Sequence, residues 1–256
     1  MFEIGVLGAS ERYQSGTFKV QKRYSHGYNF VVSYVYIREK LQNFANSLDE
    51  YNNKLTWQDS DQPHHRFNIA ATYELPFGKN KAFFSSVNRL TDALIGGWQI
   101  TGLSTYMSGD YPRFNNLNSG AAPIHSPVTI LGNPCQSNPT PESWFNTSMV
   151  PLALNSSAIV PYNVQFGCLE GPSFWNVDAT LMKSFNITER IHSQLKVTAY
   201  NAFNRLNRGD PNMDPSDPNY GRNLFQGAPG GTFGAQTAIP SNVTGRQLEI
   251  GLKIVF

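Results

Sequence analysis

The sequence predicts an all-β protein, an antiparallel up-and-down segment of a transmembrane β-barrel with about eight strands and long outer loops. Three observations lead to this prediction. Apolar and polar residues alternate in segments of roughly 9–11 residues, the length that a tilted strand needs to cross a bilayer. Aromatic residues lie near the ends of these segments, as in the aromatic girdles of outer-membrane barrels. The connections between the segments alternate between short and long, with 9–16 and 76–95 as the exceptions.

The composition agrees with β-structure joined by polar loops. Only 15% of the residues are charged, against about 25% in typical globular domains, and 13% are aromatic. The net charge of +2 comes from scattered basic residues, which predicts no nucleic-acid partner. The sequence has no apolar run of about 20 residues, so no transmembrane helix is expected. The residues after Met1 lack the basic and apolar regions of a secretory signal peptide, and none is expected in this chain.

The alternation places each expected strand in turn. The strands cover residues 2–6, 17–25, 28–36, 66–75, 98–106, 175–185, 194–203 and 247–256. Near their ends, Trp98, Tyr106, Trp175 and Phe185 are the aromatics expected at the membrane interfaces. On the opposite face, Gln99, Asp178, Lys196 and Glu249 are expected to line a wet lumen or to meet a plug. The same alternation would also fit a one-sided sheet in water, where these polar residues face solvent.

The connections support the membrane interpretation. If Phe256 lies on the periplasmic side, the periplasmic connections are the turn at 24–28 ("YSHGY"), 76–95 and 186–191. The outer connections are then 9–16, 38–65, 107–173 and 204–243. Within 76–95, Leu90, Ala93 and Leu94 predict a short amphipathic helical turn before Gly96 and Gly97. Loop lengths that depend on strand parity are typical of outer-membrane barrels, and a soluble β-sandwich has no reason for them.

Few residues suggest site chemistry. Cys135 and Cys168 are either two free thiols or a disulfide, and a location outside the cell favours the disulfide. His64 and His65 are adjacent in an expected strand end, so they point to opposite faces and indicate no metal site. The aspartates of "RGDPNMDPSDPN" indicate a solvated loop or a weak cation site. No catalytic or nucleotide-binding motif is present, which predicts that the protein is not an enzyme and has no cofactor.

Four stretches of the chain resemble the C-terminal part of a TonB-dependent outer-membrane receptor barrel. The nearest subgroup is the Oar-like receptors, which carry an N-terminal carboxypeptidase-regulatory-like domain. The stretches are "KVQKRYSHGYNFVVSYVY", "HHRFNIAATYELPFGKNK" with "LIGGWQITGLSTYMSG", "FWNVDATLMKSFNITERIHSQLKVTAYNAFNRLN" and "FGAQTAIPSNVTGRQLEIGLKIVF". This resemblance implies a place in the bacterial outer membrane. It also implies uptake of a siderophore, glycan or similar small nutrient.

The resemblance also implies partners. Such receptors have roughly 22 strands around a plug domain. Their energy comes from TonB through an N-terminal segment, and their terminal aromatic, here Phe256, is read by the barrel-assembly machinery. This chain shows no plug, no TonB box and about eight strands. Residues 1–256 are therefore expected to be the C-terminal portion of such a barrel. Its partners would be outer-membrane lipid, the missing plug and strands, and TonB through the absent N-terminal part.

Two alternatives remain open at this stage. The chain could be a self-contained small outer-membrane barrel with an adhesive or structural role, because eight strands are enough to close a barrel. It could also be a secreted β-sandwich that binds carbohydrate through loop aromatics such as Trp144 and Phe145. Pairing of "FEIGV" with "EIGLKIVF" would indicate the closed barrel. An apolar face buried in a protein core would indicate the sandwich.

Overall fold

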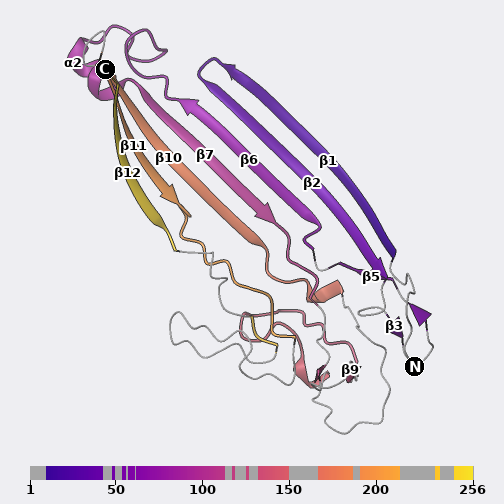
Figure 1. The fold of residues 1–256 in the computed structure, drawn as a ribbon. Coiled ribbons are helices and arrows are strands. Elements are labelled where there is room, and N and C mark those ends of the chain that lie inside the picture. Colours follow the sequence, from indigo (N-terminus) through magenta and orange to yellow (C-terminus); the bar gives the residue numbers. More distant parts are fainter. Residues whose placement is uncertain are drawn as a thin grey trace.

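The computed structural model of the chain describes residues 10–42, 48–49, 54–55, 57–60, 62–112, 117–118, 125–126, 132–149, 167–186, 191–213, 234–236 and 245–255. Its main feature is one antiparallel sheet with strand order β1-β2-β6-β7-β10-β11-β12 (Figure 1). These strands are Ser10–Ser25, Tyr28–Gln42, His65–Glu74, Trp98–Met107, Phe174–Asn186, His192–Tyr200 and Gln247–Val255. The short β5 (Gln58–Asp59) also pairs with β2. The prediction of an all-β, up-and-down fold is confirmed.

The remaining elements are small and lie in the connections. Two short ribbons pair β3 (Leu48–Asp49) with β4 (Lys54–Leu55) and β8 (Leu117–Asn118) with β9 (His125–Ser126). Two 3₁₀ turns cover Thr147–Met149 and Gly167–Leu169, and one helix, α2, covers Arg89–Ile95. The helix is the amphipathic turn expected before Gly96 and Gly97. Its N-terminus is capped by the side chain of Asn88, which accepts a hydrogen bond from the Thr91 amide at 2.8 Å.

The sheet is open. β1 and β12 are its two edges, and they do not pair with each other in the described part of the chain. The expected first strand at 2–6 ("FEIGV") lies outside the described residues, and so does its expected pairing with the last strand. The other seven expected strands are the seven long strands of the main sheet, which also includes the short β5 in the described part of the chain.

The two faces of the sheet differ in chemistry. Directly opposed residues lie on the same face of a sheet, so the pairs Tyr73–Ile100 and Ile100–Leu181 define one side, here called the apolar face. Large apolar side chains of this face are exposed at Phe18, Val20, Tyr28, Tyr36, Phe67, Ile69, Tyr73, Ile100, Leu181, Leu248, Ile250, Leu252 and Ile254. No second sheet of the described residues packs against them. The β-sandwich alternative, which requires this face to be a protein core, is therefore wrong.

The first hairpin is longer than predicted. Residues 10–16, expected to belong to an outer connection at 9–16, form the first half of β1 and pair residue by residue with β2 up to Gln42. β2 itself was expected to end at Tyr36. Ser10, Glu11 and Arg12 break the apolar alternation, which is why the pattern missed them. The backbone ladder needs no apolar face where both sides of the hairpin meet water.

Successive connections alternate between the two ends of the sheet, here called the short-turn end and the long-loop end (Figure 1). At the short-turn end, β1 turns into β2 at His26 and Gly27, with φ of 54° and 81°. This is the left-handed geometry of a two-residue hairpin turn. The connection from β6 to β7, residues 75–97 with α2, also lies at this end. It is as long as the connection 43–64 and is therefore an exception to the predicted parity of loop lengths. The two longest connections, 108–173 and 201–246, join strand ends at the long-loop end, as predicted.

Candidate functional site

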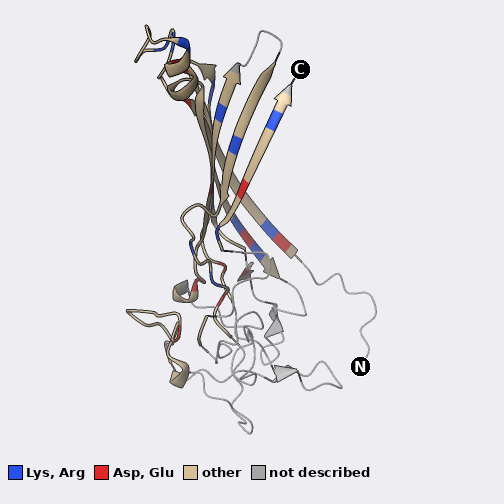
Figure 2. Cartoon of the chain, turned by 90° about the vertical axis from the view of Figure 1, so that its left-hand side faces the viewer, with Lys and Arg blue, Asp and Glu red and all other residues tan. Residues whose placement is uncertain are grey.

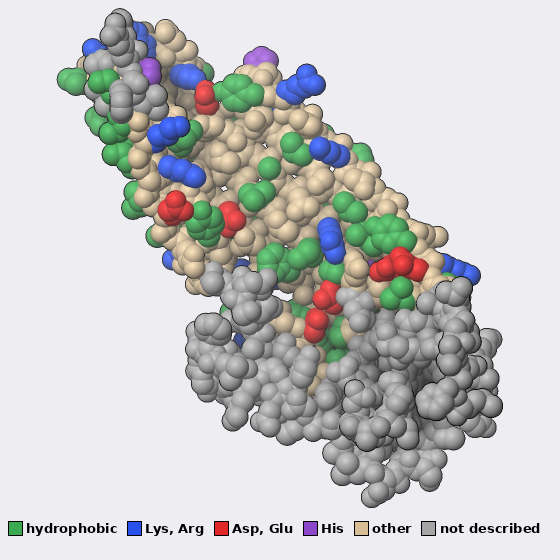
Figure 3. All heavy atoms as spheres, in the orientation of Figure 1, with side chains coloured by type: hydrophobic (Ala, Val, Ile, Leu, Met, Phe, Trp, Pro, Cys, Tyr) green, Lys and Arg blue, Asp and Glu red, His purple; other side chains and the backbone are tan. Residues whose placement is uncertain are grey.

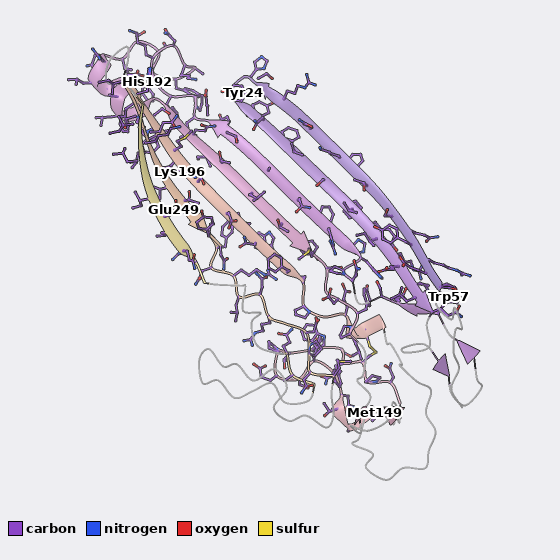
Figure 4. The ribbon with its side chains drawn as sticks, in the orientation of Figure 1. Tyr24, Trp57, Met149, His192, Lys196 and Glu249 are labelled. Atoms are coloured by element: carbon purple, nitrogen blue, oxygen red, sulfur yellow. A yellow bond between two sulfur atoms is a disulfide. The ribbon has the colours of Figure 1, made fainter. Side chains whose placement is uncertain are left out.

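The side of the sheet opposite the apolar face, here called the polar face, carries the four residues expected in the lumen. Register places Gln99 opposite Met182 and Met182 opposite Lys196. Glu249 lies opposite Thr198, in a row that continues through Thr180. Asp178, two residues from Thr180 along β10, lies on the same side. In Figure 4, Lys196 and Glu249 lie along β11 and β12, and in the same orientation Figure 3 shows acidic and basic side chains dispersed over the sheet.

Hydrogen bonds between side chains fix the polar face. Hydroxyl pairs bridge neighbouring strands from Thr72 to Thr101, at 3.2 Å, and from Thr180 to Thr198, at 3.1 Å. The Tyr200 hydroxyl donates to Glu249 at 3.0 Å. Asp178 Oδ1 accepts from the Asn176 side chain and from the Asn201 amide, each at 2.9 Å. Charged residues are widely spaced along β7, β10, β11 and β12, whereas acidic and basic residues are adjacent at the long-loop end of β1 and β2 (Figure 2). Outside that end of the hairpin, the polar face offers mainly hydroxyls and amides to whatever it contacts.

The four predicted interface aromatics lie on the apolar face. Tyr106 and Trp175 face each other across β7 and β10 near the long-loop end. Trp175 Nε1 donates to the Ser104 hydroxyl at 3.1 Å. Trp98 and Phe185 lie near the short-turn end, and Lys183 Nζ lies 5.4 Å and 5.1 Å from the centres of their rings. Amphipathic rings at both ends of one apolar band are the arrangement expected at two membrane interfaces.

At the long-loop end, parts of two distant connections pack together into what is here called the loop core. Its buried residues are Pro134, Phe145, Leu169, Pro211, Asn212, Met213 and Ala235. Backbone hydrogen bonds cross between the two connections. The Trp144 amide donates to Gly234 at 2.7 Å, and the Gln236 amide donates to Pro141 at 2.7 Å. The loop core is thus a small folded unit made from residues about ninety positions apart.

A disulfide closes the loop core. Cys135 and Cys168 are bonded, with their Cα atoms 5.8 Å apart. The disulfide ties the segment before Phe145 to the 3₁₀ turn that contains the buried Leu169. Asn207 then joins the loop core to the sheet, because its side chain accepts from the Trp175 amide and donates to the Trp175 carbonyl, each at 3.0 Å. The loops therefore hold a defined position relative to β10.

A smaller cluster lies where β6 and β7 reach the same end. The His64 ring stacks on Tyr111, with ring centroids 4.3 Å apart. Burial lowers the pKa of His64, and burial raises the pKa of Tyr111, so both rings favour their neutral forms. His65 begins β6, and its Nδ1 lies 2.9 Å from the Tyr34 hydroxyl. In the described residues, no group of three or more His, Cys, Asp or Glu side chains could hold a metal ion.

The loop core contains the residues that sequence reasoning missed. Phe145, expected as an exposed carbohydrate contact in the sandwich alternative, is fully buried, so it cannot contact a ligand. Leu169 and Asn212 were not singled out, because buried residues in a loop follow no periodic pattern. The prediction for Phe256 falls outside the described residues, as do those for Asp214 and Asp217.

The comparisons with known proteins give one finding. A family model described as an outer membrane beta barrel domain matches residues 5–248, nearly the whole chain. Searches of curated proteins and of solved structures give no match. In the described part of the chain, the helix α2 is too short and too polar to cross a bilayer, and no other helix there could do so.

Proposed function

This chain belongs to the outer-membrane β-barrel domain family, and from that premise we propose that it forms part of the wall and the outer loops of a TonB-dependent receptor for a small nutrient. The family indicates a place in the bacterial outer membrane. Short periplasmic turns and long outer loops are the rule for such barrels, so the long-loop end faces the outside of the cell. The apolar face then meets lipid and the polar face meets the interior.

The open edges support a larger barrel. Backbone groups that are unpaired within the hydrocarbon cost several kcal/mol each, and only closed barrels avoid this cost. β1 and β12 are unpaired on one side each in the described sheet. Additional strands that join β1 to β12 would satisfy both edges. A receptor barrel of the kind that the sequence resembles would provide such strands, together with a plug in the lumen.

The observation that carries the proposed role in nutrient capture is the loop core. Two long connections are folded together, closed by a disulfide, and fixed to β10 by Asn207. A loop that serves only to join strands needs none of this, since a two-residue turn at His26 and Gly27 is sufficient to join β1 to β2. Loops held in one position lose less conformational entropy when they bind a ligand. The loop core therefore fits a preformed outer surface that captures a ligand above the lumen.

Growth of a deletion strain tests the proposal. The strain that lacks the gene is compared with the parent on a panel of iron chelates and oligosaccharides, each as the sole source of iron or carbon. We expect a growth defect on at least one nutrient. We also expect that a protonophore abolishes uptake of that nutrient by the parent, because TonB-dependent transport requires energy. Equal growth on every member of the panel would count against a role in uptake.

A loop-core variant tests which part of the chain captures the nutrient. Phe145→Ala removes a fully buried ring, a change that typically costs about 3–5 kcal/mol, so it should unfold the loop core and leave the strands intact. We expect normal amounts of this variant in the outer membrane and loss of uptake. The control is Asn138→Ala, which alters an exposed residue of the same connection. Full uptake by the Phe145 variant would assign ligand capture to another part of the protein.

A self-contained small barrel is the second function considered from the sequence. It requires the strand expected at 2–6 to pair with β12, and residues 2–6 lie outside the described residues. No observation favours this alternative over a larger barrel. Disulfide cross-linking of cysteines placed at 2–6 and in β12 of the intact protein would distinguish the two. A high yield of this cross-link would indicate the small barrel.

A further inference from the structure

The apolar face is hollowed near its outer end. A cavity of about 430 Å³, here called the rim groove, is lined by Phe67, Ile69, Ser104, Tyr106, Ser173, Trp175 and Arg205. Strand register places Phe67 beside Tyr106 and Tyr106 beside Trp175, so three aromatic residues form one row across β6, β7 and β10. The rim groove extends from this row toward the membrane centre, where Ile69 and Ser104 are paired.

Small residues explain the hollow. Ser104 stands between Ile69 and Val177 in the second row, and Gly102 stands between Ala71 and Ala179 in the third. A Cβ added at Gly102 would have no neighbour within 4 Å. The next row, Tyr73, Ile100 and Leu181, is bulky again. Ser104 and Gly102 therefore leave room on the lipid-facing surface between the aromatic row and the row of Tyr73, Ile100 and Leu181.

One cation lies at the outer mouth of the rim groove. The Arg205 guanidinium lies 5.5 Å from the centre of the Trp175 ring, which also stacks on Phe203 at 5.6 Å. The Asn201 side chain holds the Arg205 backbone, accepting from its amide at 2.9 Å and donating to its carbonyl at 3.0 Å. No carboxylate of the described residues forms a salt bridge with Arg205. Its position is thus fixed, and its charge remains available for an anion at the level of the lipid headgroups.

We propose that the rim groove binds one phosphorylated lipid of the outer leaflet, with an acyl chain against Phe67, Ile69 and Trp175 and a phosphate on Arg205. The chemistry supports this occupant in two ways. An apolar hollow that faces the hydrocarbon fills with hydrocarbon, because no water is available there. A guanidinium binds phosphate through charge-assisted, often bidentate hydrogen bonds, and it does so most strongly where water is scarce. The proposal depends on the outer-membrane location and is independent of TonB-dependent uptake.

Lipid binding to the intact purified protein tests this proposal. The probe is diphosphoryl lipid A added to the protein in detergent, with bound lipid measured by native mass spectrometry. We expect Arg205→Ala to weaken binding about tenfold, the usual effect of losing one charge-assisted contact. Arg205→Lys should retain part of the affinity. The matched control is Arg208→Ala, which removes an exposed arginine that does not line the rim groove.

Two further measurements distinguish the phosphate contact at Arg205 from the acyl-chain site of the rim groove. Lipid A without its phosphates should bind the wild type and the Arg205→Ala variant equally, because the phosphate is the proposed partner of Arg205. Ser104→Leu should reduce binding of both lipids by filling the hollow, and the electrophoretic heat-modifiability of this variant shows whether the barrel is folded. Wild-type affinity in Arg205→Ala would overturn the headgroup contact. Unchanged binding in a folded Ser104→Leu variant would overturn the acyl-chain site.

Discussion

Two adjacent valines of β2 test which face of the sheet meets lipid. Val32 lies on the apolar face, opposite Val20 and Ile69, and Val31 lies on the polar face, opposite Gln21 and Ala70. Replacing each with arginine adds the same charge and volume at nearly the same height. We expect Val32→Arg to destabilise the protein strongly and Val31→Arg to have a small effect.

The position of Val32 along the strand determines how strongly Val32→Arg should destabilise the protein. Val32 lies midway between Tyr28 and Tyr36 on the apolar face. The eight steps between these tyrosines span about 27 Å along the strand, or roughly 20 Å in height at a tilt of 40°. Val32 is therefore near the middle of the apolar band, where an arginine facing lipid costs about 2–4 kcal/mol. This cost corresponds to a decrease of about 30-fold to 700-fold in the ratio of folded to unfolded protein.

The control has room for the new side chain. Val31 borders a hollow of about 410 Å³ on the polar face, which Gln21, Asn29 and Thr72 also line. An arginine there can remain hydrated. Arg23 borders the same hollow, and physiological salt screens the repulsion between two hydrated cations to below about 1 kcal/mol.

Unfolding in urea measures the stability of the two valine variants. The intact protein is folded into phosphatidylcholine vesicles, and its tryptophan fluorescence is followed as urea is added. The difference in unfolding free energy between the two variants should lie within the range of about 2–4 kcal/mol given above. Equal destabilisation by the two substitutions, or a larger effect of Val31→Arg, would show that the assignment of the faces is wrong.

Three other predictions concern the ends of the barrel wall. The double substitution Cys135→Ser with Cys168→Ser removes the disulfide, which joins residues 33 positions apart. In the chain-entropy model, its loss lowers the stability of the loop core by about 4 kcal/mol. Limited proteolysis should then cut residues 132–149 while the strands stay protected, and an uncut loop would contradict the prediction. Burial lowers the pKa of His64, so the folded state binds fewer protons than the unfolded state. The long-loop end should therefore lose stability as the pH falls below about 6.5, and His64→Gln should remove this dependence of protease susceptibility on pH. Phe256→Gln should lower the amount of intact protein in the outer membrane, and surface labelling equal to that of the wild type would refute a role in assembly.

Residue alternation predicted the strands where the two faces of the sheet differ in chemistry. Five of the seven long strands correspond to predicted segments with shifts of a few residues at their ends, because lipid on one side and water on the other impose a period of two. β1 and β2 are the exceptions, since residues 10–16 and 38–42 were expected to belong to connections. That half of the hairpin has no apolar face to maintain, and only the pairing of β1 with β2 defines it as strand.

The loop core could not be predicted by the same reasoning. Its buried residues come from four segments, and each contributes only one or two apolar side chains. The packing of Phe145 depends on which distant segments meet, since Gly234 accepts a hydrogen bond from the neighbouring Trp144 amide. The two cysteines were the only local indication that these segments form a unit, and the sequence alone left their pairing open.

Lys183 is a charged residue on the apolar face, where alternation predicts none. Register places it opposite Trp98 and Leu195, and it is only 2% exposed. Its amine donates to the Gly96 carbonyl, just after α2, and lies between the rings of Trp98 and Phe185. A lysine in that position is not exposed to hydrocarbon, because the connection that contains α2 folds back over the apolar face and supplies an acceptor. The break in the alternation thus marks the place where the connection at the short-turn end contacts the wall, beside the aromatic rings that the sequence predicts at a membrane interface.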